Sequence, residues 1–83
     1  MEPYKVYLHL ELLDAMPRRA AQKGKILQFI RSLADDPFMP GDFTDKDRSL
    51  RVRQVKIIAD YAITYWADHP VKMVVVVDIR KAD

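Results

Sequence analysis

The sequence predicts an α+β domain in the order β-α-α-β-β-β, an antiparallel sheet with a helical hairpin packed on one face. Three observations lead to this prediction. The segment "YKVYLHL" alternates apolar and polar residues, the segment 18–36 carries an apolar stripe at helical spacing, and three strand-like runs fill the C-terminal part. The length of 83 residues suits one domain, over residues 1–83.

The N-terminal part is expected to hold one strand and two helices. Apolar alternation over residues 6–10 predicts the strand. A short helix is expected over 11–16, and Pro17 suits the first turn of a second helix. Gly24 lies inside this second helix, where glycine costs about 1 kcal/mol relative to alanine. We expect that Gly24 is kept for close packing against the first helix.

The segment 35–49, "DDPFMPGDFTDKDRS", is rich in structure breakers and polar residues and predicts a loop. Loops of that length are uncommon in compact domains, and they are often functional or mobile. The three predicted strands that follow are "LRVRQVKII", "YAITYWAD" and "KMVVVVDIR".

Strict alternation along the last strand predicts which side chains meet the helices. One face would carry Met73, Val75, Val77 and Ile79. The opposite face would carry Val74, Val76, Asp78 and Arg80. We expect the first set to pack on the helical stripe of Leu27, Ile30 and Leu33.

Composition excludes several kinds of chemistry. The chain has no cysteine, so disulfides, thiolate metal sites and cysteine nucleophiles are excluded. It has no Gly-rich phosphate loop and no paired metal-ligand spacing, so neither a metal nor a small-molecule cofactor is expected. Signal-peptide features and long apolar runs are missing, which predicts a cytoplasmic protein that does not bind a membrane. The net charge of +2 does not by itself indicate nucleic-acid binding.

A cluster of basic residues gives the strongest functional signal. It comprises Lys46, Arg48, Arg51, Arg53 and Lys56. Arg51 and Arg53 share one face of a regular strand, and two guanidinium forks could clamp a phosphate. The alternative is an edge strand protected by charge against self-pairing. Arg80, at the end of the last strand, also has two interpretations: it holds a phosphate, or it keeps the strand end in water.

Aromatic residues and histidines have structural interpretations that we prefer. Tyr61, Ile63 and Tyr65 share a strand face, which is typical of a core with polar tips, although Tyr61, Tyr65 and Trp66 could also stack on bases. His69 precedes a proline in a tight hairpin, where a solvated turn residue is expected more often than a catalytic base.

The hairpin "ADYAITYW" and the closing strand "VVDIR" carry a family resemblance. In the order "YKVYLHLELLDAM…ILQFIRSLADDP…LRVRQVKIIADYAITYWAD…VVVVDIR", the chain resembles the RelE/ParE superfamily of toxins from bacterial toxin–antitoxin pairs. The resemblance implies a sheet whose first strand lies beside its last, a concave face with the active groups, and a cognate antitoxin partner. RelE-like members cut mRNA on the ribosome, whereas ParE-like members act on DNA gyrase by binding.

The family's ribonuclease residues are only partly present. Arg80 matches the closing arginine, and Arg53 lies where the family has a basic residue, so the resemblance assigns both a catalytic role. The four other basic residues would bind nucleic acid. Ala62 replaces the hairpin arginine, Ile79 replaces a histidine, and the C-terminal tyrosine is missing. The first hypothesis is a RelE-like toxin acting on RNA and translation, a weak or inactive mRNA endoribonuclease. The alternative is a non-enzymatic ParE-like binder of gyrase or antitoxin, and a third is a scaffolding domain that shares only the fold.

Overall fold

The computed structural model describes residues 2–82 and confirms the α+β class. Its elements are β1 (Lys5–Leu8), α1 (Glu11–Ala15), α2 (Ala20–Ser32), β2 (Phe43–Lys46), β3 (Val52–Ile58), β4 (Tyr61–Asp68) and β5 (Met73–Lys81). Neither α1 nor α2 is long and apolar enough to cross a membrane.

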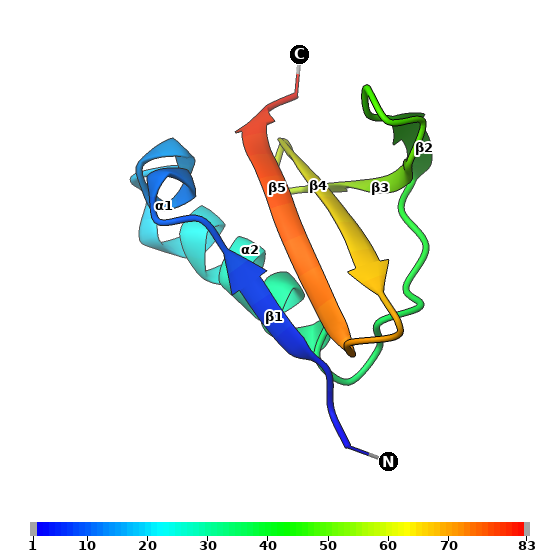
Figure 1. Cartoon of the computed structure of the whole chain (residues 1–83). Helices are drawn as coiled ribbons and strands as arrows, with labels where there is room; N and C mark the ends of the chain where they lie inside the picture. The colour runs from blue at the N-terminus through cyan, green and yellow to red at the C-terminus, as the bar shows by residue number, and fades with distance from the viewer. Residues whose placement is uncertain (1, 83) are drawn as a thin grey trace.

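The strands form one mixed sheet in the order β1-β5-β4-β3-β2. β1 pairs with β5 in parallel, and the other three pairings are antiparallel. The first strand therefore lies beside the last, as the resemblance implies. Both helices lie on one side of the sheet, next to β1 and β5, whereas β2 lies at the far edge (Figure 1). Within residues 2–82 no helix lies over the opposite face, which we call the open face.

The expected loop over 35–49 contains a strand that the sequence prediction missed. β2 has only four residues, and its Asp45 lies opposite Arg53 of β3. The turn after β2 is closed by Asp47, whose Oδ1 accepts the backbone N–H groups of Ser49 and Arg51 at 2.8 and 2.9 Å. Polar residues dominate this short strand, so it lacks the apolar alternation by which strands are usually found.

Strict alternation along β5 is also wrong, because a β-bulge interrupts it. Thr64 of β4 pairs with Asp78, but the next residue, Tyr65, pairs with Val76, so Val77 is an extra residue. An extra residue moves every later side chain to the other face. The buried residues of β5 are therefore Val74, Val76 and Ile79. Of the stripe predicted to face the helices, only Ile79 belongs to this core.

The core lies between α2 and the central strands. It is formed by Met16, Ile26, Phe29, Ile30, Leu33, Ile63, Tyr65, Val74, Val76 and Ile79. Leu33 is completely buried, but Leu27 lies only at the margin of this cluster. The expected burial of Ile63 and Tyr65 is confirmed. The prediction that Gly24 allows close packing against the first helix is wrong, because a Cβ atom at this position would have no neighbour within 4 Å.

Candidate functional site

The open face contains a hollow of about 290 Å³, which we call the open-face hollow. It is lined by Phe43, Asp45, Arg53, Val55, Ala62, Thr64, Asp78 and Arg80. These residues come from β2, β3, β4 and β5, the four strands that lie next to one another in the sheet. The structure thus brings Arg53 and Arg80, the two predicted catalytic residues, into one site.

The floor of the hollow is largely apolar. Val55 and Thr64 are register partners on β3 and β4, and both are buried. Phe43 pairs with Val55 from β2 but leaves 53% of its surface exposed. Ile57 lies two residues beyond Val55 on the same face of β3 and is 37% exposed. Two large apolar side chains therefore remain accessible at the border of the hollow.

Arg53 is held by a carboxylate on the neighbouring strand. Its Nε donates to Asp45 Oδ1 at 2.8 Å, and its Nη2 donates to Asp45 Oδ2 at 2.9 Å. This two-point geometry is the strongest form of a guanidinium–carboxylate contact. The hydrogen bonds to Asp45 raise the pKa of Arg53, and the charges of Asp45, Asp47 and Asp78 raise it further, against the opposing effect of burial. Arg53 is thus a permanent cation, and the edge of its guanidinium formed by Nε and Nη2 is already bound to Asp45.

Arg80 also has a carboxylate partner. Its Nε donates to Asp78 Oδ2 at 2.5 Å, and 74% of its side chain is exposed. The bulge at Val77 decides this placement. Without the extra residue, Asp78 and Arg80 would share a face with Val74 and Val76 and would point toward the helices. With the extra residue, both side chains reach the open face. The sequence predicts that Arg80 points away from the helices, but it does so from strict alternation along the strand, which the bulge contradicts.

The two aspartates of the hollow were not predicted as site residues. Asp45 belongs to the segment that the sequence predicts as a loop, and for Asp78 the sequence predicts only a place on one face of the last strand. Their sequence signal is weak, because an aspartate near an arginine is common in any charged chain. Together with Arg53 and Arg80 they form four formal charges that sum to zero, since two carboxylates balance two guanidiniums.

The other predicted basic residues lie outside the hollow. Arg51 stacks over Trp66, with its Cζ 3.9 Å from the ring centroid, and forms an ion pair of 3.7 Å with Asp47. Lys56 forms an ion pair of 3.3 Å with Asp42. Lys46 is exposed at the end of β2, and Arg48 is exposed in the turn that follows. The six predicted site residues therefore do not form one basic patch.

The segment before β2 is anchored tightly to β3. Asp42 Oδ2 accepts the backbone N–H of Ile57 at 2.8 Å, and this hydrogen bond, with a smaller contribution from Lys56, lowers the pKa of Asp42. The N–H of Gly41 donates to Gln54 Oε1 at 2.9 Å. A Cβ atom at Gly41 would lie 2.5 Å from the carbonyl oxygen of Val55, so only glycine fits here. These contacts hold β2 in place beside β3.

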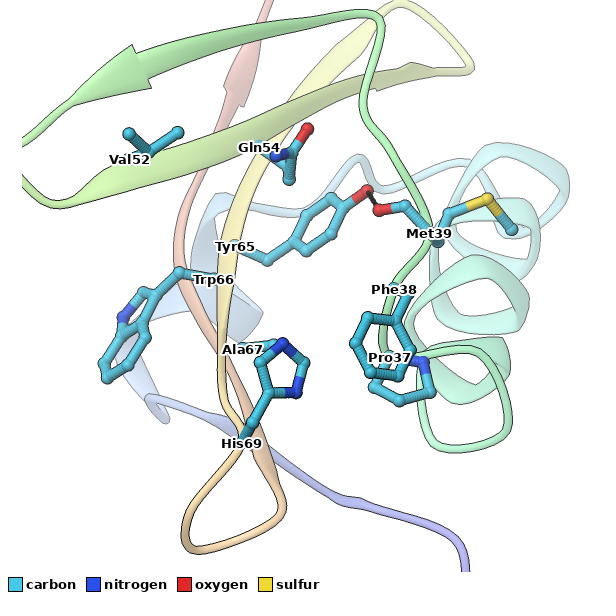
Figure 2. A pocket seen from close by; sticks show the side chains of 9 residues that line it. All are labelled: Pro37, Phe38, Met39, Val52, Gln54, Tyr65, Trp66, Ala67 and His69. Atoms are coloured by element: carbon cyan, nitrogen blue, oxygen red, sulfur yellow. Dashed lines mark hydrogen bonds between the residues drawn. The ribbon is translucent and has the colours of Figure 1, made fainter.

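A second hollow, of about 260 Å³, lies between residues 37–39 and strands β3 and β4 (Figure 2). The Tyr65 hydroxyl donates to the carbonyl oxygen of Met39 at 2.9 Å, and burial raises the pKa of Tyr65 to about 12. The His69 ring stacks on Phe38 with 4.5 Å between centroids, and its Nδ1 is 2.9 Å from the Tyr4 hydroxyl. These contacts fasten the chain after α2 and the β4–β5 turn, and His69 is not among the residues that line the open-face hollow.

Comparisons with known proteins give no family assignment. A scan against protein-family models, a search of curated proteins and a search of solved structures each found no match to this chain. Among residues 2–82, no group of three or more histidine, cysteine, aspartate or glutamate side chains could hold a metal ion.

Proposed function

We propose that this chain is the toxin-type component of a toxin–antitoxin pair and that it acts by binding a protein target rather than by cutting RNA. Two features support the first part: the hairpin and closing-strand motifs resemble those of RelE/ParE toxins, and β1 lies beside β5 as that resemblance implies. One observation carries the second part. Arg53 and Arg80 are each paired with an aspartate, so the charges of the described residues that line the hollow sum to zero.

The chemistry of RNA cleavage explains why this pairing matters. Cleavage needs a group that activates the 2′-hydroxyl, a group that protonates the leaving oxygen and cations that stabilise the phosphorane. Positioned acids and bases contribute about 100- to 10,000-fold each. Among the described residues, Asp45 and Asp78 are the only titratable lining groups besides the arginines, and both already accept hydrogen bonds from them. Protein binding requires none of these groups.

The apolar border of the hollow supports a protein partner. Exposed aromatic residues beside arginines are typical of the few residues that dominate binding energy at protein interfaces. Phe43 and Ile57 are accessible, and Arg53 and Arg80 lie beside the same floor. The proposed occupant is a segment of the cognate antitoxin, which would cover these apolar side chains. The cellular target of the free toxin would then be bound through the same face, and DNA gyrase is the candidate that a ParE-like mode of action suggests.

A second candidate function is an RNA-directed toxin that acts on mRNA at the ribosome. The observation that favours it is the convergence of Arg53 and Arg80 on one hollow. Two guanidiniums could neutralise a scissile phosphate if both carboxylates moved aside. This candidate predicts new mRNA ends during expression, which the first candidate does not.

Induced expression in a bacterium tests these candidates. Growth, translation, plasmid supercoiling and mRNA ends are followed in parallel, with and without co-expression of the product of an adjoining small open reading frame. We expect growth arrest that this product relieves, with no new mRNA ends. Phe43→Ser should remove the arrest, whereas Val71→Ser, which alters an exposed apolar residue of the β4–β5 turn, should not.

Each other outcome has a definite meaning. New mRNA ends that depend on Arg53 and Arg80 would establish the RNA-directed candidate. Normal growth at an expression level verified by immunoblot would remove the toxin assignment altogether. An arrest that is equal in Phe43→Ser and in the unmutated chain would show that the target binds elsewhere on the molecule.

A further inference from the structure

The charged side chains of the open-face hollow alternate in sign. Asp45 binds Arg53 through two hydrogen bonds, and Asp78 binds Arg80 through one. Asp78 also acts on Arg53, since its negative charge contributes to the raised pKa of that guanidinium. The order Asp45, Arg53, Asp78, Arg80 thus places a carboxylate beside each arginine, and Asp78 influences both.

This alternation has a direct consequence for phosphate ligands. A phosphate that approached Arg53 would have to displace Asp45 from the Nε and Nη2 atoms or bind beside its negative charge. At Arg80, Asp78 occupies only Nε, so a phosphate that bound the Nη atoms would still lie beside the negative charge of Asp78. A nucleic-acid backbone presents several phosphates in succession, so it would meet both carboxylates at once. The affinity of a protein for nucleic acid depends on how many phosphates its cationic side chains neutralise. In the hollow, Asp45 and Asp78 already offset the charges of Arg53 and Arg80.

We infer that Asp45 and Asp78 are specificity-determining residues that exclude nucleic acid from the open-face hollow. Asp45 occupies the Nε and Nη2 atoms of Arg53, and Asp78 occupies Nε of Arg80, so a backbone phosphate at either guanidinium would lie beside a carboxylate. A protein segment that covers Phe43 and Ile57 with apolar side chains can bind without breaking either ion pair. The inference rests on the ion pairs alone and does not depend on the chain being a toxin.

Removal of the two carboxylates should convert the hollow into an RNA-binding site. The probe is a short fluorescently labelled single-stranded RNA, and binding is measured by anisotropy at low salt. We expect Asp45→Asn/Asp78→Asn to bind this RNA roughly tenfold more tightly than the unmutated chain, because two like charges beside the phosphates are removed. The affinity of the variant should also fall more steeply with salt, as expected when more phosphates are neutralised.

Two controls separate the hollow from overall charge. Asp14→Asn/Asp35→Asn raises the formal net charge of +2 by the same two units at exposed positions of α1 and of the segment after α2, and should bind no better than the unmutated chain. Addition of Arg53→Gln/Arg80→Gln to the asparagine pair should abolish the gain. Circular dichroism melts establish that each variant is folded. If loss of Asp45 prevents folding, Asp78→Asn alone decides, and it should still bind several-fold more tightly.

Three results would overturn the inference. The first is no gain in RNA affinity in a folded variant that lacks Asp78. The second is an equal gain in Asp14→Asn/Asp35→Asn, which would make the effect one of net charge. The third is tight RNA binding by the unmutated chain that Arg53→Gln/Arg80→Gln abolishes, because the arginines would then already be available to phosphates.

Discussion

Asp45 and Arg53 lie directly opposite one another on the antiparallel strands β2 and β3, and the guanidinium binds both carboxylate oxygens, at 2.8 and 2.9 Å. This ion pair joins the edge strand β2 to the sheet, and it engages one of the two arginines of the open-face hollow. A strand as short as β2 has few backbone hydrogen bonds of its own, so its side-chain anchors matter for its stability.

Arg53 and Arg80 should respond differently to lysine. Lysine cannot reproduce a two-point contact, so Arg53→Lys is expected to lower the free energy of unfolding by up to about 1 kcal/mol, the usual range for a partly exposed ion pair. Arg80 is far more exposed than Arg53, and Arg80→Lys should change that free energy by less than about 0.5 kcal/mol. Urea titrations of both variants measure the contrast. Equal effects would show that the Asp45 contact adds nothing to stability.

Leu27 in α2 and Leu33, which directly follows this helix, should differ in how much they stabilise the core. Leu33 is completely buried, so Leu33→Ala should cost about 2–5 kcal/mol of unfolding free energy. Leu27 lies at the margin of the core, and Leu27→Ala should therefore cost clearly less. Chemical denaturation of the two variants checks the order. A larger loss for Leu27→Ala would mean that the buried face of α2 has been misassigned.

The two glycines should respond in opposite directions to alanine. Gly24 lies inside α2 with open space around it, so Gly24→Ala should stabilise the protein by about 0.5–1 kcal/mol. A Cβ atom at Gly41 would collide with the backbone of Val55, and Gly41→Ala should cost about 1–3 kcal/mol. Thermal melts of both variants provide the measurement. A destabilised Gly24→Ala protein would restore the expectation that this glycine serves close packing.

The raised pKa of Tyr65 leads to a prediction of how the free energy of unfolding changes at alkaline pH. Burial disfavours the phenolate, so the pKa of Tyr65 is raised to about 12 in the folded chain, above the value of about 10 for an unfolded tyrosine. The folded state therefore keeps a proton that the unfolded state loses. This contribution to stability is complete below pH 10 and is lost as pH rises through about 12.

The variant Tyr65→Phe lacks the titrating group and provides the comparison for this prediction. Urea unfolding should show a decline in stability between pH 10 and 12 that is smaller in Tyr65→Phe than in the unmutated chain. The variant should be less stable at neutral pH, because the hydrogen bond to the Met39 carbonyl is lost. Parallel declines in both proteins would show that Tyr65 does not titrate in this range.

Local patterns in the sequence were enough to predict most elements of the fold. The predicted strand "YAITYWAD" coincides with β4, and "KMVVVVDIR" differs from β5 by one residue at each end. These runs are long and rich in β-branched and aromatic residues, which favour strands by themselves. The helix expected within 18–36 is also present, as α2. The sequence alone also identified Arg53 and Arg80 as candidate site residues.

What the tertiary structure alone decided is which side chains meet. An alternating pattern does not reveal an extra residue, because a bulge depends on how two strands pair and not on the composition of one. Val77 therefore changed the face of Asp78 and Arg80 without any local signal. In the same way, the polar segment of β2 is a strand only because the edge of β3 pairs with it, and this pairing brought Asp45 to Arg53. Whether a guanidinium is open to a phosphate or already bound to a carboxylate is a property of contacts between strands, and the local pattern of residues along one strand does not reveal it.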